Sequence, residues 1–190
     1  MPRSVTGGRR PGAATSARPL LPHRRHRAPI RGRERSRHEP PRPEVDREMS
    51  AIPAIRPARA TDAGAVLSLA RPFATSFVID ERAFYEAHAA LLASTEARLL
   101  VAESGGRIVG YLLGVDHHTF FANGRVASVE EIMVEESWRR RGVGLALMRE
   151  FEAWARGREC RLVALATRRA SAFYAAIGYE ESAVYFRKLL

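Results

Sequence analysis

The segment from Val129 to Met148 restricts the fold most, because three local patterns follow one another in it without a gap. Residues 126–134, largely apolar apart from Glu130 and Glu131, predict a strand that ends in this segment, and a turn containing Gly142 and Gly144 follows it. Apolar residues then recur at helical spacing: Val143, Leu147, Phe151 and Trp154. The segment therefore predicts a strand that leads through a glycine turn into a long helix over 141–156, with Gly157 as a natural residue to end it.

The remaining sequence predicts further strands and helices in alternation. The expected strands cover 52–58, 99–102, 108–115, 126–134, 162–166 and 183–189, and the expected helices begin near Thr61, Asp80, Arg141 and Ala170. We expect a loop at 117–125 and a break of the first helix from Pro72 onward. Residues 162–166 are nearly all apolar, as in a strand buried on both faces. The predicted fold class is α/β, with a mixed central sheet flanked by helices.

Residues 1–48 differ from the rest of the chain in charge and composition. They hold 13 arginines, 5 acidic residues and 8 of the 11 prolines, and so account for +8 of the net charge of +10. With few large apolar side chains, such a segment cannot offset the entropy of ordering, and we expect it to be disordered. An over-long gene start before Met49 is the preferred interpretation, and a targeting peptide or a nucleic-acid-binding arm is the alternative. We expect the folded domain over 49–190.

Cys160 is the only cysteine, which excludes an intramolecular disulfide and a thiolate metal cluster. No apolar stretch approaches the roughly 20 residues that a membrane-spanning helix needs. The near-neutral charge of residues 49–190 gives no reason to expect nucleic acid as a partner. We expect a cytoplasmic protein that uses no metal. The oligomeric state stays open, with a homodimer as one alternative.

The turn before the long helix has the chemistry of a phosphate site. Glycines let the backbone approach a ligand closely, and the first N–H groups of a helix have no partner within it. These donors and the helix dipole attract an anion, and Arg139, Arg140 and Arg141 add positive charge. The turn is neither a Walker A loop nor a dinucleotide fingerprint, which needs a third glycine. A tight strand-to-helix turn without a ligand is the alternative.

Three segments together resemble the GNAT superfamily of acyl-CoA-dependent N-acetyltransferases. Arg139, Gly142 and Gly144 match its Gln/Arg-x-x-Gly-x-Gly/Ala motif. Residues 170–179 (Ala-Ser-Ala-Phe-Tyr-Ala-Ala-Ile-Gly-Tyr) are similar to its second motif, and residues 55–62 (Ile-Arg-Pro-Ala-x-x-x-Asp) to its first strand and helix. The resemblance extends over nearly all of 52–190. It implies a GNAT-like fold and acetyl-CoA as co-substrate, and it says nothing about the acceptor.

The resemblance also implies where acetyl-CoA binds. The pyrophosphate would rest on the glycine turn and the residues after it: Arg139, Arg140, Arg141, Gly142, Val143, Gly144, Leu145 and Ala146. The pantetheine arm would pair like an added strand with the backbone around Met133 and Val134, where an N–H would polarise the thioester carbonyl. The family often has an asparagine before the second-motif helix, and here residues 167–169 read Thr-Arg-Arg.

Two kinds of catalytic residue follow from the same resemblance. Tyr174 is the implied general acid, since a phenol can protonate the departing thiolate. Because Phe173 suits the core, we expect Tyr174 to face a cleft, and an ordinary aromatic on an amphipathic helix is the alternative. Glu130 is the first candidate for the base, and Glu131 is the second. A solvated carboxylate is the alternative there, and a bulge in this strand would prevent an assignment from alternation alone.

The sequence therefore predicts an N-acetyltransferase in which a primary amine attacks acetyl-CoA directly. An acyl-CoA-binding regulatory module without turnover is the alternative from another class of protein. We expect the acceptor pocket between the loops at 73–80 and 116–125. Its expected lining is aromatic and rich in histidine: Phe77, His117, His118, Phe120 and Phe121. The identity of the acceptor amine stays open.

Overall fold

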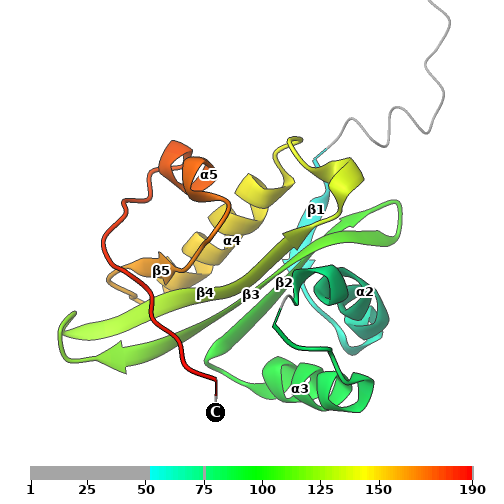
Figure 1. The fold of residues 1–190 in the computed structure, drawn as a ribbon, viewed down its shortest axis with the longest axis horizontal. Coiled ribbons are helices and arrows are strands. Elements are labelled where there is room, and N and C mark those ends of the chain that lie inside the picture. Colours follow the sequence, from blue (N-terminus) through cyan, green and yellow to red (C-terminus); the bar gives the residue numbers. More distant parts are fainter. Residues whose placement is uncertain (1–51, 75, 190) are drawn as a thin grey trace, which may run out of the picture. The chain divides into compact units, whose positions relative to one another are not determined.

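The computed structural model describes residues 52–74 and 76–189, and the expected leader and domain start at 1–49 lie outside this part of the chain. The described residues form a five-stranded sheet in the order β1-β2-β3-β4-β5, with helices on both faces (Figure 1). The first four strands are antiparallel neighbours, and β5 runs parallel to β4. The expected fold class, a mixed sheet flanked by helices, is confirmed.

The bounds of the elements are as follows. The strands are β1 (Ala54–Pro57), β2 (Ala97–Ser104), β3 (Arg107–Thr119), β4 (Gly124–Val134) and β5 (Val163–Leu165). The α-helices are α2 (Ala63–Phe73), α3 (Glu81–Ala93), α4 (Val143–Gly157) and α5 (Ser171–Ala176). Two short 3-10 helices, η1 (Ala60–Asp62) and η2 (Glu136–Trp138), precede α2 and follow β4. Within 52–74 and 76–189, each helix is too short or too polar to cross a membrane.

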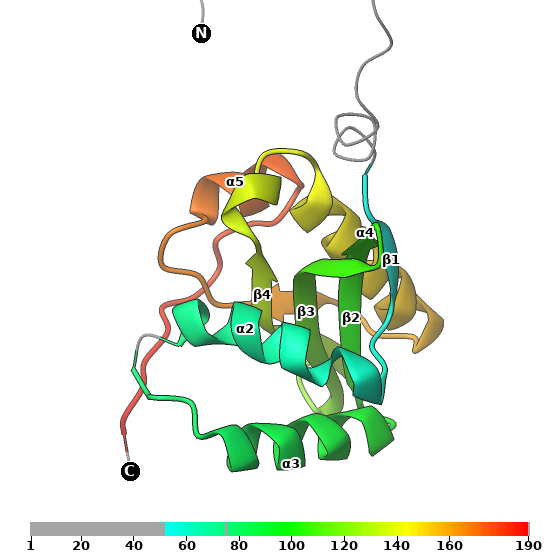
Figure 2. The same ribbon diagram turned by 90° about the vertical axis from the view of Figure 1, so that its right-hand side faces the viewer.

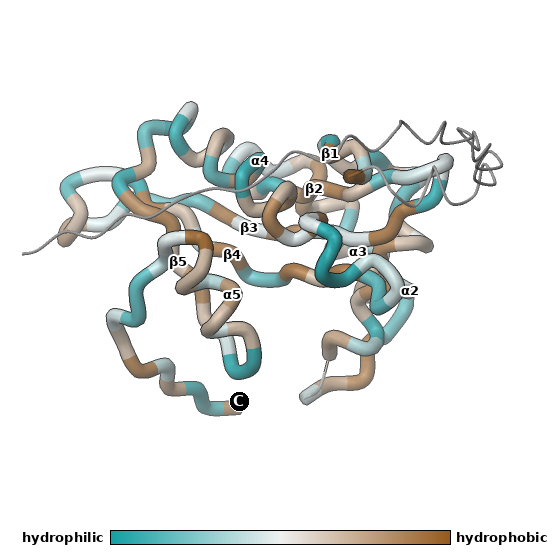
Figure 3. The backbone as a smooth tube through the Cα atoms, turned by 90° about the horizontal axis from the view of Figure 1, so that it is seen from above, coloured by the Kyte–Doolittle hydropathy of each residue, from teal (hydrophilic) through white to brown (hydrophobic). Residues whose placement is uncertain are grey.

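The sheet separates two apolar layers. On one face, Leu147 and Phe151 of α4 are fully buried in a cluster with Leu112 of β3. On the other face, Val66 of α2 and Tyr111 of β3 share a second cluster, which α3 also joins. Figure 2 shows α2 and α3 in front of the strands and α4 behind them. In Figure 3 the apolar colour follows stretches of β2 and β4, as expected of strands covered on both faces.

Close packing of α4 on the sheet depends on Gly114 of β3. A Cβ placed on Gly114 would collide with the ring of Phe151 and would lie 2.7 Å from the carbonyl oxygen of Ser128. Protein interiors are close-packed, so neither neighbour can move away without opening a void. The absence of a side chain at Gly114 therefore sets how closely the helix approaches the strands.

Several predicted bounds differ from the structure. The expected loop at 117–125 is largely strand, because β3 and β4 extend into it and a short turn with Asn123 at φ 51° joins them. Pro72 lies inside the last turn of α2, which ends one residue later. The long helix begins at Val143 rather than at Arg141, because Gly142 adopts the left-handed conformation with φ 83°.

The C-terminal part departs most from the prediction. β5 spans three residues, which are half-buried or exposed rather than buried on both faces. The expected strand at 183–189 is absent from the described chain, where residues 180–189 are irregular and exposed. Both predictions are wrong. Val163 and Leu165 pack against the α4 cluster while Ala164 between them is exposed, so β5 is covered on one face. Among the described residues, β5 has β4 on one side and no strand on the other.

Candidate active site

The turn between β4 and α4 presents four backbone amides that have no hydrogen-bond partner within the described part of the chain. The N–H of Ala146 donates to the carbonyl oxygen of Gly142 at 2.9 Å and is the first amide bonded within α4. Among the described residues, no backbone hydrogen bond of this turn uses the amides of Gly142, Val143, Gly144 or Leu145. These donors lie at the positive end of the helix dipole, where an anion is favoured. The amide of Ala146 is not available, contrary to the expectation, because it already has a partner.

Two residues with positive φ shape this turn. Gly142 has φ 83° and Arg140 has φ 60°, a region that residues with a side chain rarely adopt. Gly144 stands beside α5, since a Cβ placed on it would lie 3.5 Å from the ring of Phe173. The glycine turn and the second-motif helix are therefore neighbours.

The arginines of the turn differ in what they contact. Arg139 donates from Nε to the carbonyl oxygen of Val134 at 3.0 Å, and its Nη2 lies 4.0 Å from the sulfur of Met133. The guanidinium carbon of Arg141 lies 5.6 Å from the centre of the Trp138 ring, in a cation–π contact. Arg139 thus ties the turn to the end of β4. Its side chain is engaged with the strand, where the sequence suggested a phosphate contact.

One edge of β4 is open beyond Val129. β5 pairs with β4 only over Ala127–Val129 and ends at Leu165, whereas β4 continues for five more residues to Val134. β4 and β5 are therefore not paired with each other where β4 approaches the glycine turn. An extended ligand can pair with such an edge as an added strand.

The direction of the amides along this edge follows from one hydrogen bond. The N–H of Glu135 donates to the carbonyl oxygen of Val109 on β3 at 2.9 Å. Because successive amides of a strand point to opposite sides, the N–H of Val134 faces the open edge and that of Met133 faces β3. Of the two residues expected to meet the pantetheine arm, Val134 presents its amide there and Met133 does not.

Glu130 is an extra residue in β4. In the pairing of β3 with β4, Leu113 lies opposite Glu131 and Gly114 lies opposite Val129. Glu130 has no partner on β3 and forms a β-bulge. The bulge lies four residues before the end of the strand, beside the stretch with the open edge.

The bulge places two carboxylates in succession off the α4 face. Val129 and Ile132 both pack in the α4 cluster although they are three positions apart, which regular alternation does not allow. The two residues between them are an exposed Glu130 and a half-buried Glu131. The hydroxyl of Tyr111 donates to Oε2 of Glu131 at 2.6 Å. The bulge is thus present, and alternation along the strand does not decide between the two glutamates.

Tyr174 is buried, and the expected division of roles between it and its neighbour is wrong. Tyr174 is 7% exposed and belongs to the α4 cluster, whereas Phe173 is only half-buried. Its ring packs edge-on against Phe173 and Tyr179, with centres 5.1 and 5.9 Å away. Burial raises the pKa of Tyr174. The phenol therefore keeps its proton at neutral pH and can donate it.

Thr167 stands close to the place where the family often has an asparagine, and it stabilises the start of α5. Its Oγ1 accepts the backbone N–H of Ala170 at 3.1 Å. Arg168 and Arg169, which follow it, are exposed. The segment shortened in the sequence thus ends in a turn, closed by the Thr167 side chain, that leads to Ala170, the N-cap residue of the helix that carries Tyr174.

The acceptor side only partly matches the expectation. Phe120 and Phe121 are exposed at the tip of the β3–β4 hairpin rather than gathered in a lining. The loop between α2 and α3 does border a pocket, lined by Arg71, Ala74, Phe77, Val78, Ile79, Asp80 and Glu81. Of the two loops expected to form the acceptor pocket, the first therefore borders a pocket and the second is a hairpin.

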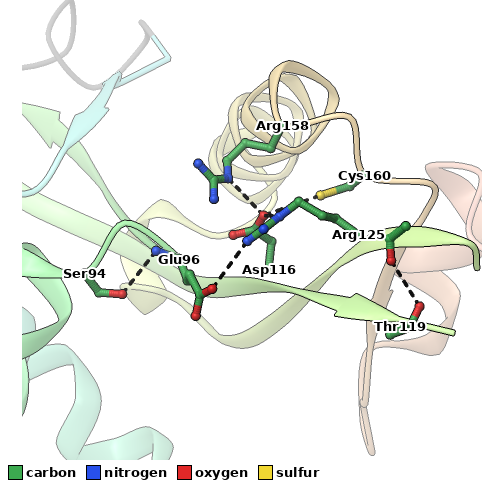
Figure 4. Close-up of polar contacts among 8 residues, drawn as sticks. Ser94, Glu96, Asp116, Thr119, Arg125, Arg158 and Cys160 are labelled. Atoms are coloured by element: carbon green, nitrogen blue, oxygen red, sulfur yellow. Dashed lines mark hydrogen bonds and ion pairs between the residues drawn. The ribbon is translucent and has the colours of Figure 1, made fainter.

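The base of that hairpin holds a buried ionic cluster instead (Figure 4). Oδ2 of Asp116 on β3 accepts from Nε of Arg158 at 2.9 Å and from Nε of Arg125. The sulfur of Cys160 lies 3.9 Å from the same oxygen. Asp116 is fully buried, and the two arginines that contact it compensate its charge. The cluster fastens the C-terminal end of α4 to the sheet, at the opposite end of the helix from the glycine turn.

Comparison with known proteins agrees with this arrangement. The model of the acetyltransferase (GNAT) family matches residues 65–179, and no curated protein sequence matches the chain. An acetyltransferase of Trypanosoma brucei is 22% identical with a TM-score of 0.63, over 72% of this chain and 99% of the other.

Two solved aminoglycoside acetyltransferases have the same fold. An aminoglycoside antibiotic 6'-N-acetyltransferase of Acinetobacter haemolyticus is 25% identical with a TM-score of 0.60, over 72% of this chain and 99% of the other. An aminoglycoside N-acetyltransferase in complex with CoA is 22% identical with a TM-score of 0.63, over 71% of this chain and 93% of the other. The family model spans more than half of the chain and includes β4, the glycine turn, α4 and α5. The chain therefore belongs to the GNAT acetyltransferase family.

Proposed function

We propose that the protein transfers an acetyl group from acetyl-CoA to a primary amine. The observation that carries the proposal is the row of four amides at 142–145, to which no described residue is hydrogen-bonded, beside the open edge of β4. The amides suit a pyrophosphate, and the open edge suits the extended pantetheine arm. The names of two solved relatives support the choice of partners, since one was solved with CoA and both are N-acetyltransferases of aminoglycosides.

The proposed reaction is a direct transfer without an acyl-enzyme. A bond forms between the amine nitrogen and the acetyl carbon, the bond from that carbon to sulfur breaks, and the products are an amide and the CoA thiol. The nitrogen gives up one proton, and the sulfur takes up one proton. Acetyl-CoA supplies the activated acetyl group, and the residues of the chain position it and move the two protons.

Val134 and Tyr174 have separate tasks in this proposal. The N–H of Val134 on the open edge donates to the thioester oxygen, where negative charge develops. Tyr174 donates the proton that the sulfur takes up, because its buried hydroxyl stays protonated at neutral pH. The phenol recovers a proton from solvent after the thiol leaves.

The base that takes the proton from the amine comes from the two carboxylates at the bulge. The sequence favours Glu130, which is exposed. Glu131 is the second candidate, half-buried and already hydrogen-bonded on one side. Both are within the same short stretch of β4 as the open edge.

The cofactor site is tested by two variants at one position, Gly144→Glu and Gly144→Gln. Gly144 lies in the first turn of α4, and a Cβ there makes an ordinary contact at 3.5 Å with Phe173. The two new side chains have nearly the same shape, but only the glutamate adds negative charge among the four amides. We expect the acetyl-CoA affinity of Gly144→Glu, measured by calorimetry, to be about tenfold lower than that of Gly144→Gln. This corresponds to a difference of roughly 1.4 kcal/mol in binding free energy. Equal affinities in both variants and the unaltered chain would remove the turn from the site.

A measurement of turnover distinguishes an acetyltransferase from the alternative, a regulatory module that binds acyl-CoA. Release of the CoA thiol is followed with acetyl-CoA and a panel of primary amines, including an aminoglycoside. Transfer to an amine supports the proposal. Tight binding of acetyl-CoA without transfer to any amine would support a regulatory module that binds acyl-CoA and does not turn over.

A further inference from the structure

We propose that Tyr111 is a positioning residue that acts through Glu131. It holds one oxygen of this carboxylate, so that the other oxygen receives the proton from the acceptor amine. The inference rests on the proposed function and deepens it, because it makes Glu131 the base of the pair at the bulge.

The position of Tyr111 is fixed by the core. Its side chain is 1% exposed and packs in the cluster formed by α2, α3 and the sheet, with Val66 and Val101 among its members. On β3 it lies opposite Met133, two residues along from Glu131 on β4. Such diagonal neighbours share one face of an antiparallel pair and lie within reach of an aromatic side chain. The phenol oxygen is accordingly held at a set place, 2.6 Å from Oε2 of Glu131.

The direction of the hydrogen bond between Tyr111 and Glu131 does not change over the pH range of an activity assay. Burial, and then the neighbouring charge of Glu131, raise the pKa of Tyr111 far above its usual value. The phenol is always the donor, and Oε2 of Glu131 is always the acceptor. In the described part of the chain, Oε1 of Glu131 has no hydrogen-bond partner, and neither glutamate of the bulge takes part in an ion pair. One oxygen is thus occupied and the other is available to an amine.

Glu130 lacks this support. It is exposed, it has no partner on β3, and among the described residues it makes no side-chain hydrogen bond. A flexible carboxylate has to be ordered each time it acts, whereas general-base catalysis needs a group at a fixed distance from the proton. The bulge and Tyr111 together give Glu131 the better-defined geometry.

The experiment compares Tyr111→Phe, Glu131→Gln and Glu130→Gln in the full chain, on an amine that the unaltered chain acetylates. We expect Tyr111→Phe to lower kcat roughly ten- to a hundredfold, the usual worth of a hydrogen bond to a charged group, with KM for acetyl-CoA unchanged. In the plot of kcat against pH for Tyr111→Phe, the acidic limb should move to higher pH, because the ionised carboxylate of Glu131 loses a hydrogen-bond donor. The double variant Tyr111→Phe/Glu131→Gln should be no slower than Glu131→Gln alone, since Tyr111 acts through Glu131.

Tyr179→Phe is the matched control. It removes another Tyr–Glu hydrogen bond, from the Tyr179 hydroxyl to Oε1 of Glu152 at 3.0 Å, and should leave the acidic limb in place. The midpoint of thermal unfolding is measured for each variant. If Tyr111→Phe does not fold, the two glutamine variants decide, and a greater loss in Glu130→Gln would overturn the inference.

The outcomes separate this inference from the function on which it rests. Transfer by the unaltered chain combined with an unmoved acidic limb in Tyr111→Phe, or a further loss in the double variant, would overturn the inference alone. A lack of transfer to every amine of the panel would overturn the proposed function and the inference with it.

Discussion

Arg56 holds the carboxylate of Asp62 at two points, with Nη1 2.7 Å from Oδ2 and Nη2 2.9 Å from Oδ1. Asp62 also accepts the backbone N–H of Arg59 at 2.7 Å, and it is buried. The pair connects the edge strand β1 to the first turn of α2. This contact gives a physical reason for the spacing of Arg and Asp in the first motif.

Asp62→Asn should lower the free energy of unfolding by about 2–3 kcal/mol, because the buried two-point ion pair with Arg56 would be lost and Arg56 would keep Glu103 alone as a charged partner. Urea unfolding measures the change. Glu86→Gln is the control, since Glu86 pairs with Arg82 at 3.0 Å on the exposed face of α3 and should matter by less than about 0.5 kcal/mol. Similar losses in the two variants would contradict a special role for the Arg56–Asp62 pair.

The same pair predicts how stability depends on acid pH. The hydrogen bonds from Arg56 lower the pKa of Asp62 in the folded state. The unfolded chain, in which an aspartate titrates near its usual value of about 3.9, then binds the proton first. The contribution of Asp62 is therefore complete above about pH 4 and is lost as the pH falls through the folded pKa. Unfolding free energies measured between pH 7 and 3 should decline less steeply in Asp62→Asn, and parallel curves would contradict this assignment.

Gly114→Ala should destabilise the protein by about 2–3 kcal/mol, because the added methyl group collides with the ring of Phe151. The control is Gly64→Ala in α2, where a Cβ has nothing within 4 Å and should be neutral or stabilise by up to about 1 kcal/mol. A smaller residue at position 151 in the Gly114→Ala background should recover part of the loss. Unfolding midpoints that fall equally in both alanine variants would show that α4 does not press on Gly114.

Tyr174→Phe should keep acetyl-CoA affinity and fold stability, because the ring continues to pack against Phe173 and Tyr179. It should lower kcat by roughly ten- to a thousandfold, since only the proton donor for the thiolate is lost. Calorimetry with acetyl-CoA and steady-state rates on the amine acceptor measure the two effects. A kcat equal to that of the unaltered chain would leave solvent or another residue as the acid.

The sequence predicts well what depends on neighbouring residues. The strand, glycine turn and helix from Val129 onward are local patterns, and the structure places the four amides at 142–145 where those patterns indicate. The left-handed Gly142 explains why α4 begins two residues later than its apolar spacing suggests. Hairpin length at 117–125 was underestimated, because polar residues there pair across strands rather than form a loop.

Contacts between distant strands could not be predicted from the sequence. Tyr111 meets Glu131 only because of the register of β3 and β4, and that register shifts at a bulge which neither strand alone reveals. Asp116 is a comparable case, since an acidic residue next to an apolar strand was a signal, but its arginine partners lie 9 and 42 residues away. The burial of Tyr174 depends on how α5 sits against α4, which helical spacing over six residues does not determine.

The bulge at Glu130 adds one residue to β4 without altering the fold of the sheet. Deleting either glutamate yields one and the same polypeptide, in which Val-Glu-Ile-Met-Val replaces Val-Glu-Glu-Ile-Met-Val. In that shortened strand, Val129, Ile132 and Val134, which all pack toward α4, would alternate without interruption. The sheet would thus close over a regular ladder with one carboxylate fewer, so the sixth residue of this stretch is not required by the architecture. The bulge leaves the side chains before and after it on the same faces as in the shortened strand, and what the added residue supplies is a second carboxylate next to the first.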